Sequence, residues 1–160
     1  MVIVLNIAGL KIPGIIISYL NSMEKKESEI VPVLAAVIFN DKNEVLIAKR
    51  KPNLSQGNLW EFPGGKLKVY ETPEACLRRE IKEELGIDIQ IKDLWYAVNY
   101  SYAKINILLI AYRAELVEKK ITLTDHSEFK WVSLIDLNEI DFSPADRLLI
   151  KKLTNQTINF

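Results

Sequence analysis

The stretch from Gly64 to Ile87 constrains the fold of this chain more than any other, because it specifies a helix and both of its ends. Thr72 is a typical N-cap residue, and Pro73 suits the first helical position, where its missing N–H is no loss. Gly86 supplies the glycine that commonly ends a helix. The sequence therefore predicts a helix between Thr72 and Gly86, preceded by a loop that begins at the glycines.

The predicted helix carries a row of acidic side chains. At about 100° per residue, Glu80, Glu83 and Glu84 fall within an arc of about 100°, beside an apolar stripe. Like charges at these spacings repel by a few tenths of a kcal/mol per pair, so a cation is expected there. Three carboxylates, with a carbonyl or two from the glycine loop, are typical of a Mg²⁺ or Mn²⁺ site. Water on such a metal, deprotonated by a spare carboxylate, would attack phosphorus. A solvated acidic surface is the alternative for a bare glutamate run.

The wider spacing favours the metal site. Gly65, five residues, Glu71 and seven further residues lead into Arg79-Glu80-Ile81-Lys82-Glu83-Glu84-Leu85-Gly86-Ile87. This pattern resembles the signature of Nudix hydrolases, G-x5-E-x7-R-E-U-x-E-E-x-G-U with U aliphatic, and every specified position is met. The flanking segments, from about Val31 to Leu153, look like the MutT-like branch, which cleaves nucleoside triphosphates.

The order of the expected elements predicts an α+β fold. Strands and two separated helices without regular alternation argue for a mixed α/β sandwich and against a Rossmann sheet. The resemblance implies the same architecture, a Nudix-type α/β/α sandwich with a mixed sheet and a loop-helix-loop catalytic box. Strands are expected at 31–39, 44–49, 87–91, 93–102, 104–116 and 129–132, a short apolar piece at 59–62, loops at 51–58, 64–72 and 118–128, a turn or short helix at 133–140, and a closing helix from Pro144 that includes 148–153.

A chain of 160 residues suits one domain, which we expect at 23–160. Residues 1–22 form an apolar extension that is a poor membrane span, because Asn, Gly, Lys and Pro interrupt it. Nor does it show the basic start and small-residue cleavage site of a secretory signal. We favour translation from Met23, and a peripheral membrane or partner-binding arm is the alternative.

The charge balance and the few cysteine and histidine residues exclude several classes of function. Lys plus Arg equals Asp plus Glu, 21 each, so we expect neither a nucleic-acid polymer partner nor stable membrane association. The single cysteine, Cys76, excludes an internal disulfide, and the single histidine, His126, excludes a His-rich zinc site. We expect a cytoplasmic monomer or homodimer.

The resemblance implies a role for each box residue. Glu80, Glu83, Glu84 and the carbonyl of Gly64 would gather Mg²⁺, with Mn²⁺ as a possible substitute. Arg79 and Glu71 match a supporting pair, in which the arginine orients carboxylates. Asp125, ahead of the last strand, stands where the family places an acidic residue that completes the site or acts as base; Glu128 is the fallback, and a solvated loop the alternative. The predicted catalytic set is Glu80, Glu83, Arg79, Glu71 and Asp125. We do not assign His126 as the base, because the carboxylates suffice.

The resemblance also implies a nucleotide pocket lined by Arg50, Glu61, Phe62, Pro63 and Gly64. Tyr102 and Lys104 are placed to stack on and contact the ligand, although aromatic strand residues are often simply packed.

Asp146 stands where the founding MutT pattern has asparagine. An ionised aspartate only accepts, so it favours an exocyclic amine, as in cytosine or guanine, unless it is protonated; capping of the last helix is the alternative.

The implied activity is metal-dependent hydrolysis of a (deoxy)nucleoside triphosphate to the monophosphate and pyrophosphate, as in nucleotide pool sanitation. An oxidised purine such as 8-oxo-dGTP and a cytidine nucleotide both remain open as substrates. The alternatives are hydrolysis of another nucleoside diphosphate derivative, such as ADP-ribose, and a non-catalytic nucleotide-sensing or protein-binding module. The intact box argues against the latter.

Overall fold

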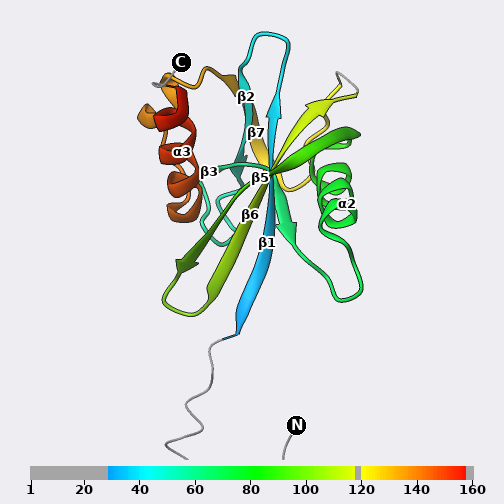
Figure 1. Cartoon of the computed structure of the whole chain (residues 1–160), viewed down its shortest axis with the longest axis vertical. Coiled ribbons are helices and arrows are strands. Elements are labelled where there is room, and N and C mark those ends of the chain that lie inside the picture. Colours follow the sequence, from blue (N-terminus) through cyan, green and yellow to red (C-terminus); the bar gives the residue numbers. More distant parts are fainter. Residues whose placement is uncertain (1–28, 118–119, 158–160) are drawn as a thin grey trace, which may run out of the picture.

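The computed structural model describes residues 29–117 and 120–157, and it places one mixed sheet between two helices (Figure 1). The strand order is β3-β2-β1-β6-β5, with β4 paired to β1 and β7 paired to β2. Strand β1 runs parallel to β6, and the other pairings are antiparallel. This arrangement confirms the predicted α+β sandwich. The elements are β1 (Ile30–Phe39), β2 (Val45–Arg50), β3 (Trp60–Glu61), β4 (Gly64–Lys66), α2 (Pro73–Leu85), β5 (Ile89–Ser101), β6 (Asn106–Leu116), β7 (His126–Val132), the 3₁₀ helix η1 (Asp136–Glu139) and α3 (Pro144–Thr157).

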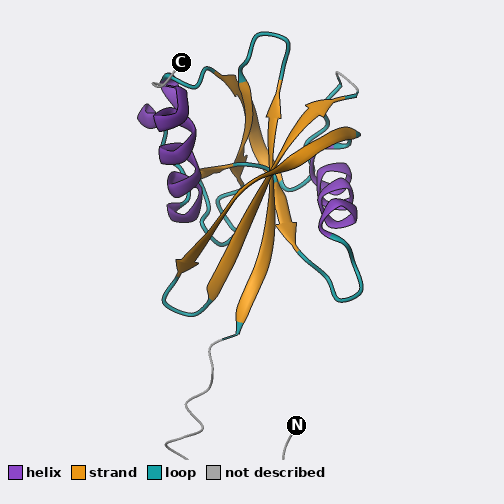
Figure 2. Cartoon of the chain, viewed as in Figure 1, coloured by secondary structure: helices purple, strands orange, loops and turns teal. Residues whose placement is uncertain are grey.

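Strand β1 contributes to two hydrophobic cores, one on each face of the sheet. Because side chains alternate along a strand, Ala35 and Val37 pack in the core that contains α3 residues, whereas Leu34 and Ile38 pack in the core that contains α2 residues. Figure 2 shows the helices on opposite sides of the sheet. A strand buried on both faces explains the nearly continuous apolar run of β1.

Helix α2 begins and ends as predicted. The Thr72 hydroxyl accepts a hydrogen bond from the Ala75 N–H at 3.2 Å, and Pro73 follows the cap. Gly86 has a φ of 68°, and its N–H donates to the Lys82 carbonyl at 3.1 Å. The apolar stripe of α2 is fully buried and consists of Leu77, Ile81 and Leu85. Its burial turns the acidic row of the helix toward the edge of the sheet.

The glycine segment differs from the prediction of a loop from Gly64 to Thr72. Gly64–Lys66 forms β4, which pairs antiparallel with β1. Gly64 has a φ of 154°, and a Cβ there would lie 2.1 Å from the Leu34 carbonyl oxygen. Only glycine allows so close an approach, and the resulting contact with a distant strand leaves no local pattern in the sequence.

Three of the strand predictions were wrong by more than one residue. Strand β7 starts at His126, because its pairing with β2 extends to a pair between Arg50 and His126. Strand β5 is one element with two bulges, where separate strands were predicted at 87–91 and 93–102. Strand β6 starts at Asn106 and not at Lys104. The turn or short helix expected at 133–140 is confirmed, since η1 lies within it.

No helix in 29–117 or 120–157 is long and apolar enough to cross a membrane. The apolar extension at 1–22 lies outside the described residues, so its interpretation and the domain limits of 23–160 stay predictions.

Candidate active site

A cavity of about 680 Å³ brings together residues from both helices and the sheet. Its lining includes Glu80 and Glu84 of α2 and Asp146 of α3. Arg50 of β2 and Glu61 of β3 also line it. The cavity therefore has an α2 end with the box carboxylates and an α3 end with Asp146.

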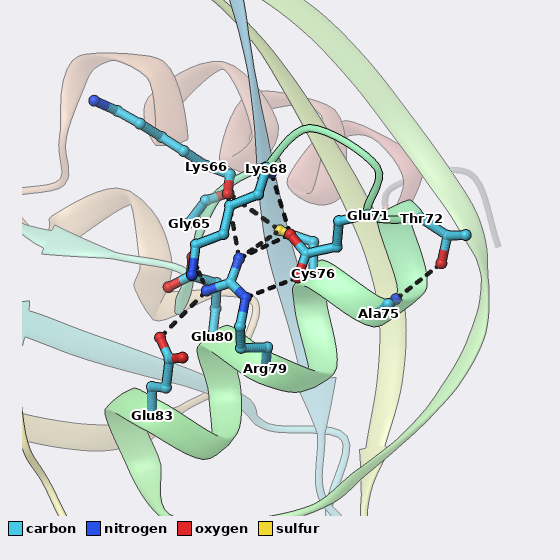
Figure 3. Close-up of polar contacts among 10 residues, drawn as sticks. All are labelled: Gly65, Lys66, Lys68, Glu71, Thr72, Ala75, Cys76, Arg79, Glu80 and Glu83. Carbon is cyan, nitrogen blue, oxygen red and sulfur yellow. Dashed lines mark hydrogen bonds and ion pairs between the residues drawn. The ribbon is translucent and has the colours of Figure 1, made fainter.

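Arg79 binds three carboxylates at the α2 end (Figure 3). Its Nε and Nη2 donate to the two oxygens of Glu71 at 2.7 and 2.9 Å. Its Nη1 donates to Glu80 at 2.6 Å and to Glu83 at 3.2 Å. The hydrogen bonds from Arg79 lower the pKa of Glu71 to about 2 and raise the pKa of Arg79 itself. Arg79 therefore fixes the direction in which Glu80 and Glu83 point.

The backbone of β4 supports this group. A Cβ on Gly65 would lie 2.3 Å from the Glu80 carboxyl carbon, so the missing side chain makes room for that carboxylate. Cys76 is fully buried, and its Sγ lies 3.4 Å from the Lys66 carbonyl oxygen. Burial raises the pKa of its thiol to about 12, which makes it an unreactive packing residue.

Glu84 has a different environment from the other box glutamates. It is only 7% exposed, and its Oε2 accepts a hydrogen bond from the Gly64 N–H at 3.1 Å. Burial, followed by the charge of Glu61, raises the pKa of Glu84 to about 8. A cation beside it would offset this cost, because a nearby positive charge favours the ionised form.

The described residues contain no group of three Asp, Glu, His or Cys side chains already arranged around a metal position. Arg79 holds Glu80 and Glu83, and the Gly64 N–H holds Glu84. The chemistry of the set still fits a hard divalent cation, since it offers several carboxylates on one helix edge, and one of them, Glu84, is buried and forms no ion pair within the described part of the chain.

Asp146 lies in the first turn of α3 and is 6% exposed. Its Oδ1 accepts from the Phe62 N–H at 3.1 Å, and its Oδ2 accepts from the Ser143 hydroxyl. Burial and the charge of Glu61 raise the pKa of Asp146 to about 7. Asp146 thus contacts the start of α3 and also lines the cavity, and its contact with a base stays a prediction.

The middle of the cavity wall contains a contact that the sequence analysis missed. Glu61 Oε1 lies 2.8 Å from both Arg50 Nη1 and His126 Nε2. His126 is on β7 and is only 2% exposed, whereas a loop position was expected. Its pairing with Arg50 across the sheet is non-local, so the sequence offers no direct signal for it.

All but one of the predicted nucleotide-binding residues line the cavity. Phe62, Gly64, Tyr102 and Lys104 line the cavity with Arg50 and Glu61. Pro63 is buried outside the lining, where its carbonyl accepts from the Ala36 N–H at 2.8 Å. The sequence around some further lining residues predicts only a loop, a strand or a helix cap, so it gave no sign that they face a cavity. These residues are Ser55, Gln56, Ile105, Ile107, Leu109 and Ser143.

The remaining acidic candidates lie outside the lining. Glu71 and Glu83 contact Arg79 instead. Asp125 is exposed just before β7, and Glu128 pairs with Lys130 at 3.3 Å. A base role for Asp125 stays a prediction.

The family model described as NUDIX domain matches residues 30–153. The chain belongs to the NUDIX domain family. The "8-oxo-dGTP diphosphatase" of Escherichia coli K12 is 35% identical over 121 residues, which cover 76% of this Nudix chain and 94% of that protein. The "CTP pyrophosphohydrolase" of the same organism is 28% identical over 123 residues, covering 77% and 90%.

A similar solved structure is a MutT protein from Methanosarcina mazei Go1, with a TM-score of 0.75 and 27% identity over 82% of this chain and 97% of that chain. The predicted family, the Nudix fold and the pyrophosphohydrolase class are therefore confirmed.

Proposed function

We propose that this Nudix protein hydrolyses a (deoxy)nucleoside triphosphate to the monophosphate and pyrophosphate in the cytoplasm, with Mg²⁺ or Mn²⁺ bound. The observation that carries the proposal is a single cavity lined by Glu80 and Glu84 at one end and by Asp146 at the other. A triphosphate needs charge compensation at one end and recognition of its base at the other. The names of the two Escherichia coli relatives agree with this chemistry.

Glu80, Glu83, Glu84 and the Gly64 carbonyl would hold the metal. When bound, a divalent metal polarises phosphoryl oxygens and lowers the pKa of its water ligand. Arg79, which is hydrogen-bonded to Glu71, orients the carboxylates of Glu80 and Glu83. Residues that contact metal ligands commonly have this supporting role. Asp125 would accept a proton from the attacking water.

Arg50, Glu61, Phe62, Tyr102 and Lys104 would contact the nucleotide. Pro63 supports the segment from behind the wall.

We infer that Asp146 contacts the base. With a pKa of about 7, it is present in both forms near neutral pH. The ionised form accepts from an exocyclic amine, whereas the protonated form donates to a base carbonyl. A cytidine nucleotide and an oxidised purine nucleotide therefore both suit this position.

Pyrophosphate release with Mg²⁺, across a panel of normal, methylated and oxidised triphosphates, tests the proposal. We expect at least one triphosphate to yield its monophosphate and pyrophosphate. Glu83→Gln should lower kcat/KM by about a hundredfold or more, because a metal ligand is lost. The matched control is Glu74→Gln, an exposed glutamate in the first turn of the same helix, which should retain activity. Equal activity of wild type and Glu83→Gln would refute the metal assignment, and a wholly inactive panel would favour a binding module.

A further inference from the structure

None of the roles proposed above explains the contact between His126 and Glu61. The His126 ring is buried, and its Nε2 lies 2.8 Å from Glu61 Oε1. The same oxygen accepts from Arg50 Nη1 at 2.8 Å. The Glu61 and Arg50 side chains, 14% and 25% exposed, line the cavity. A buried ring thus holds a carboxylate, which in turn holds a guanidinium at the cavity wall.

The geometry of His126 does not suit a base. Because an ionised carboxylate only accepts, His126 Nε2 is the donor and Glu61 Oε1 the acceptor of this hydrogen bond. Its Nδ1 is buried and has no hydrogen-bond partner among the described residues. The ring is also absent from the cavity lining. Neither nitrogen can take a proton from a water in the cavity, so the ring acts on the site only through Glu61.

Glu61 and Arg50 hold each other in one arrangement. Arg50 is fixed a second time, because its Nε donates to the Ser55 carbonyl at 2.6 Å. Within the described part of the chain, Arg50 Nη2 and Glu61 Oε2 have no hydrogen-bond partner. They form a donor and an acceptor on neighbouring side chains. A guanidinium N–H suits a phosphate oxygen, and a carboxylate oxygen suits a sugar hydroxyl.

Glu61 also lies between the two ends of the cavity. The N–H of the next residue, Phe62, donates to Asp146 at the α3 end, and the N–H of Gly64 donates to Glu84 at the α2 end, each at 3.1 Å. A nucleotide with its phosphates near Glu84 and its base near Asp146 would place its sugar and α-phosphate against this part of the wall.

We propose that His126 is a positioning residue for nucleotide binding, which fixes Glu61 and, through it, Arg50 against the sugar and α-phosphate. The proposal rests on the nucleotide site proposed above. It gives a role to the buried His126, which lies 65 residues from Glu61 in the sequence.

Two substitutions of His126 separate the hydrogen bond from the packing. In His126→Gln the side-chain amide reaches about as far as Nε2 and can still donate, whereas His126→Leu fills the space without a donor. We expect His126→Leu to raise KM for both 8-oxo-dGTP and CTP about tenfold while kcat changes less than about threefold, since a ground-state contact is lost. His126→Gln should restore most of the KM. Equal KM values in the two variants, or a fall in kcat alone, would overturn the proposal.

A double-mutant cycle with Glu61→Ala tests whether His126 acts through Glu61. We expect His126→Leu to change KM by less than about twofold in the Glu61→Ala background, because the carboxylate it positions is gone. A purely structural histidine would instead cost the same in both backgrounds, in KM and in thermal stability. Additive effects on KM would therefore contradict the proposal.

Nitrogen NMR provides a readout that needs no turnover, because His126 is the single histidine of the chain. Untagged protein labelled at histidine should show the Nε2–H tautomer, and Glu61→Ala should shift that resonance.

Binding of nucleoside monophosphates is a second readout that needs no turnover. CMP and dGMP, used as probes, should bind more weakly to His126→Leu than to wild type. An Nδ1–H tautomer, or equal binding of both monophosphates, would refute this inference. If monophosphate binding weakens as expected but the wild type cleaves no triphosphate, only the proposed hydrolysis fails.

Discussion

Five carboxylates in or beside this cavity fall into two groups with opposite environments. The outer carboxylates, Glu71, Glu80 and Glu83, all contact Arg79, and the pKa of Glu71 falls to about 2. The inner carboxylates, Glu84 and Asp146, are buried beside Glu61, and their pKa values rise to about 8 and about 7. Contact with one arginine and a difference in burial thus separate side chains of the same chemistry. Arg79 supplies positive charge on the outer side, whereas the inner side gains from a bound cation or a proton.

Arg79→Lys should have the largest effect on this contrast. Lysine cannot donate to Glu71, Glu80 and Glu83 in the fixed planar geometry of the guanidinium. We expect kcat/KM to fall about 10- to 100-fold and the Mg²⁺ concentration for half activity to rise. The matched control is Arg78→Lys, because Arg78 points elsewhere and donates to the Ile89 carbonyl at 2.7 Å. Similar losses in both variants would show that the outer carboxylates do not depend on Arg79.

Gly65→Ala should have the next largest effect, because it displaces one outer carboxylate without removing it. The added Cβ would meet the flexible end of the Glu80 side chain, which can move away at little cost. We expect about a tenfold loss of kcat/KM with nearly unchanged thermal stability.

The matched variant is Gly64→Ala, which places a Cβ 2.1 Å from the backbone oxygen of Leu34 at a φ of 154°. It should destabilise the fold instead, by thermal unfolding. Full activity in Gly65→Ala would contradict the close placement of Glu80 against this glycine.

Asp146→Asn should give a smaller effect, visible in the pH dependence of stability. An acid whose pKa is raised from 3.8 to about 7 binds more protons in the folded state, so its contribution to stability is lost as pH rises through this window. Asparagine does not titrate.

The quantity to compare is the free energy of unfolding of Asp146→Asn minus that of wild type, measured without metal. This difference should increase by at least about 1 kcal/mol from pH 5 to pH 8. Denaturant unfolding at the two pH values measures this difference, with the exposed turn residue substituted in Asp41→Asn as control. A constant difference would mean that the buried Asp146 carboxyl does not titrate in this range.

The outer group could be predicted from the sequence because its residues are local. Thr72, Pro73 and Gly86 fix the helix, and the helical repeat places Glu80, Glu83 and Glu84 on one edge. The repeat does not reveal that Glu84 is buried while Glu83 is exposed, since that depends on how β1 and β4 pack against α2. The inner group depends on such non-local contacts, as in the hydrogen bond between Phe62 and Asp146, 84 residues apart. The contact of His126 with Glu61 was missed for the same reason, because only the pairing of β7 with β2 brings the two side chains together.

The division of labour between the metal-holding glutamates and Asp146 is tested most directly by the ratio of kcat/KM for 8-oxo-dGTP to kcat/KM for CTP. We expect Glu80→Gln to lower both values about a hundredfold and to leave their ratio within about threefold of wild type, because an outer carboxylate serves the phosphates that both substrates share. Asp146→Asn should change the ratio by about tenfold or more, because an amide offers the base a different hydrogen-bonding pattern. A ratio that changes in Glu80→Gln, or one that stays the same in Asp146→Asn, would contradict the account.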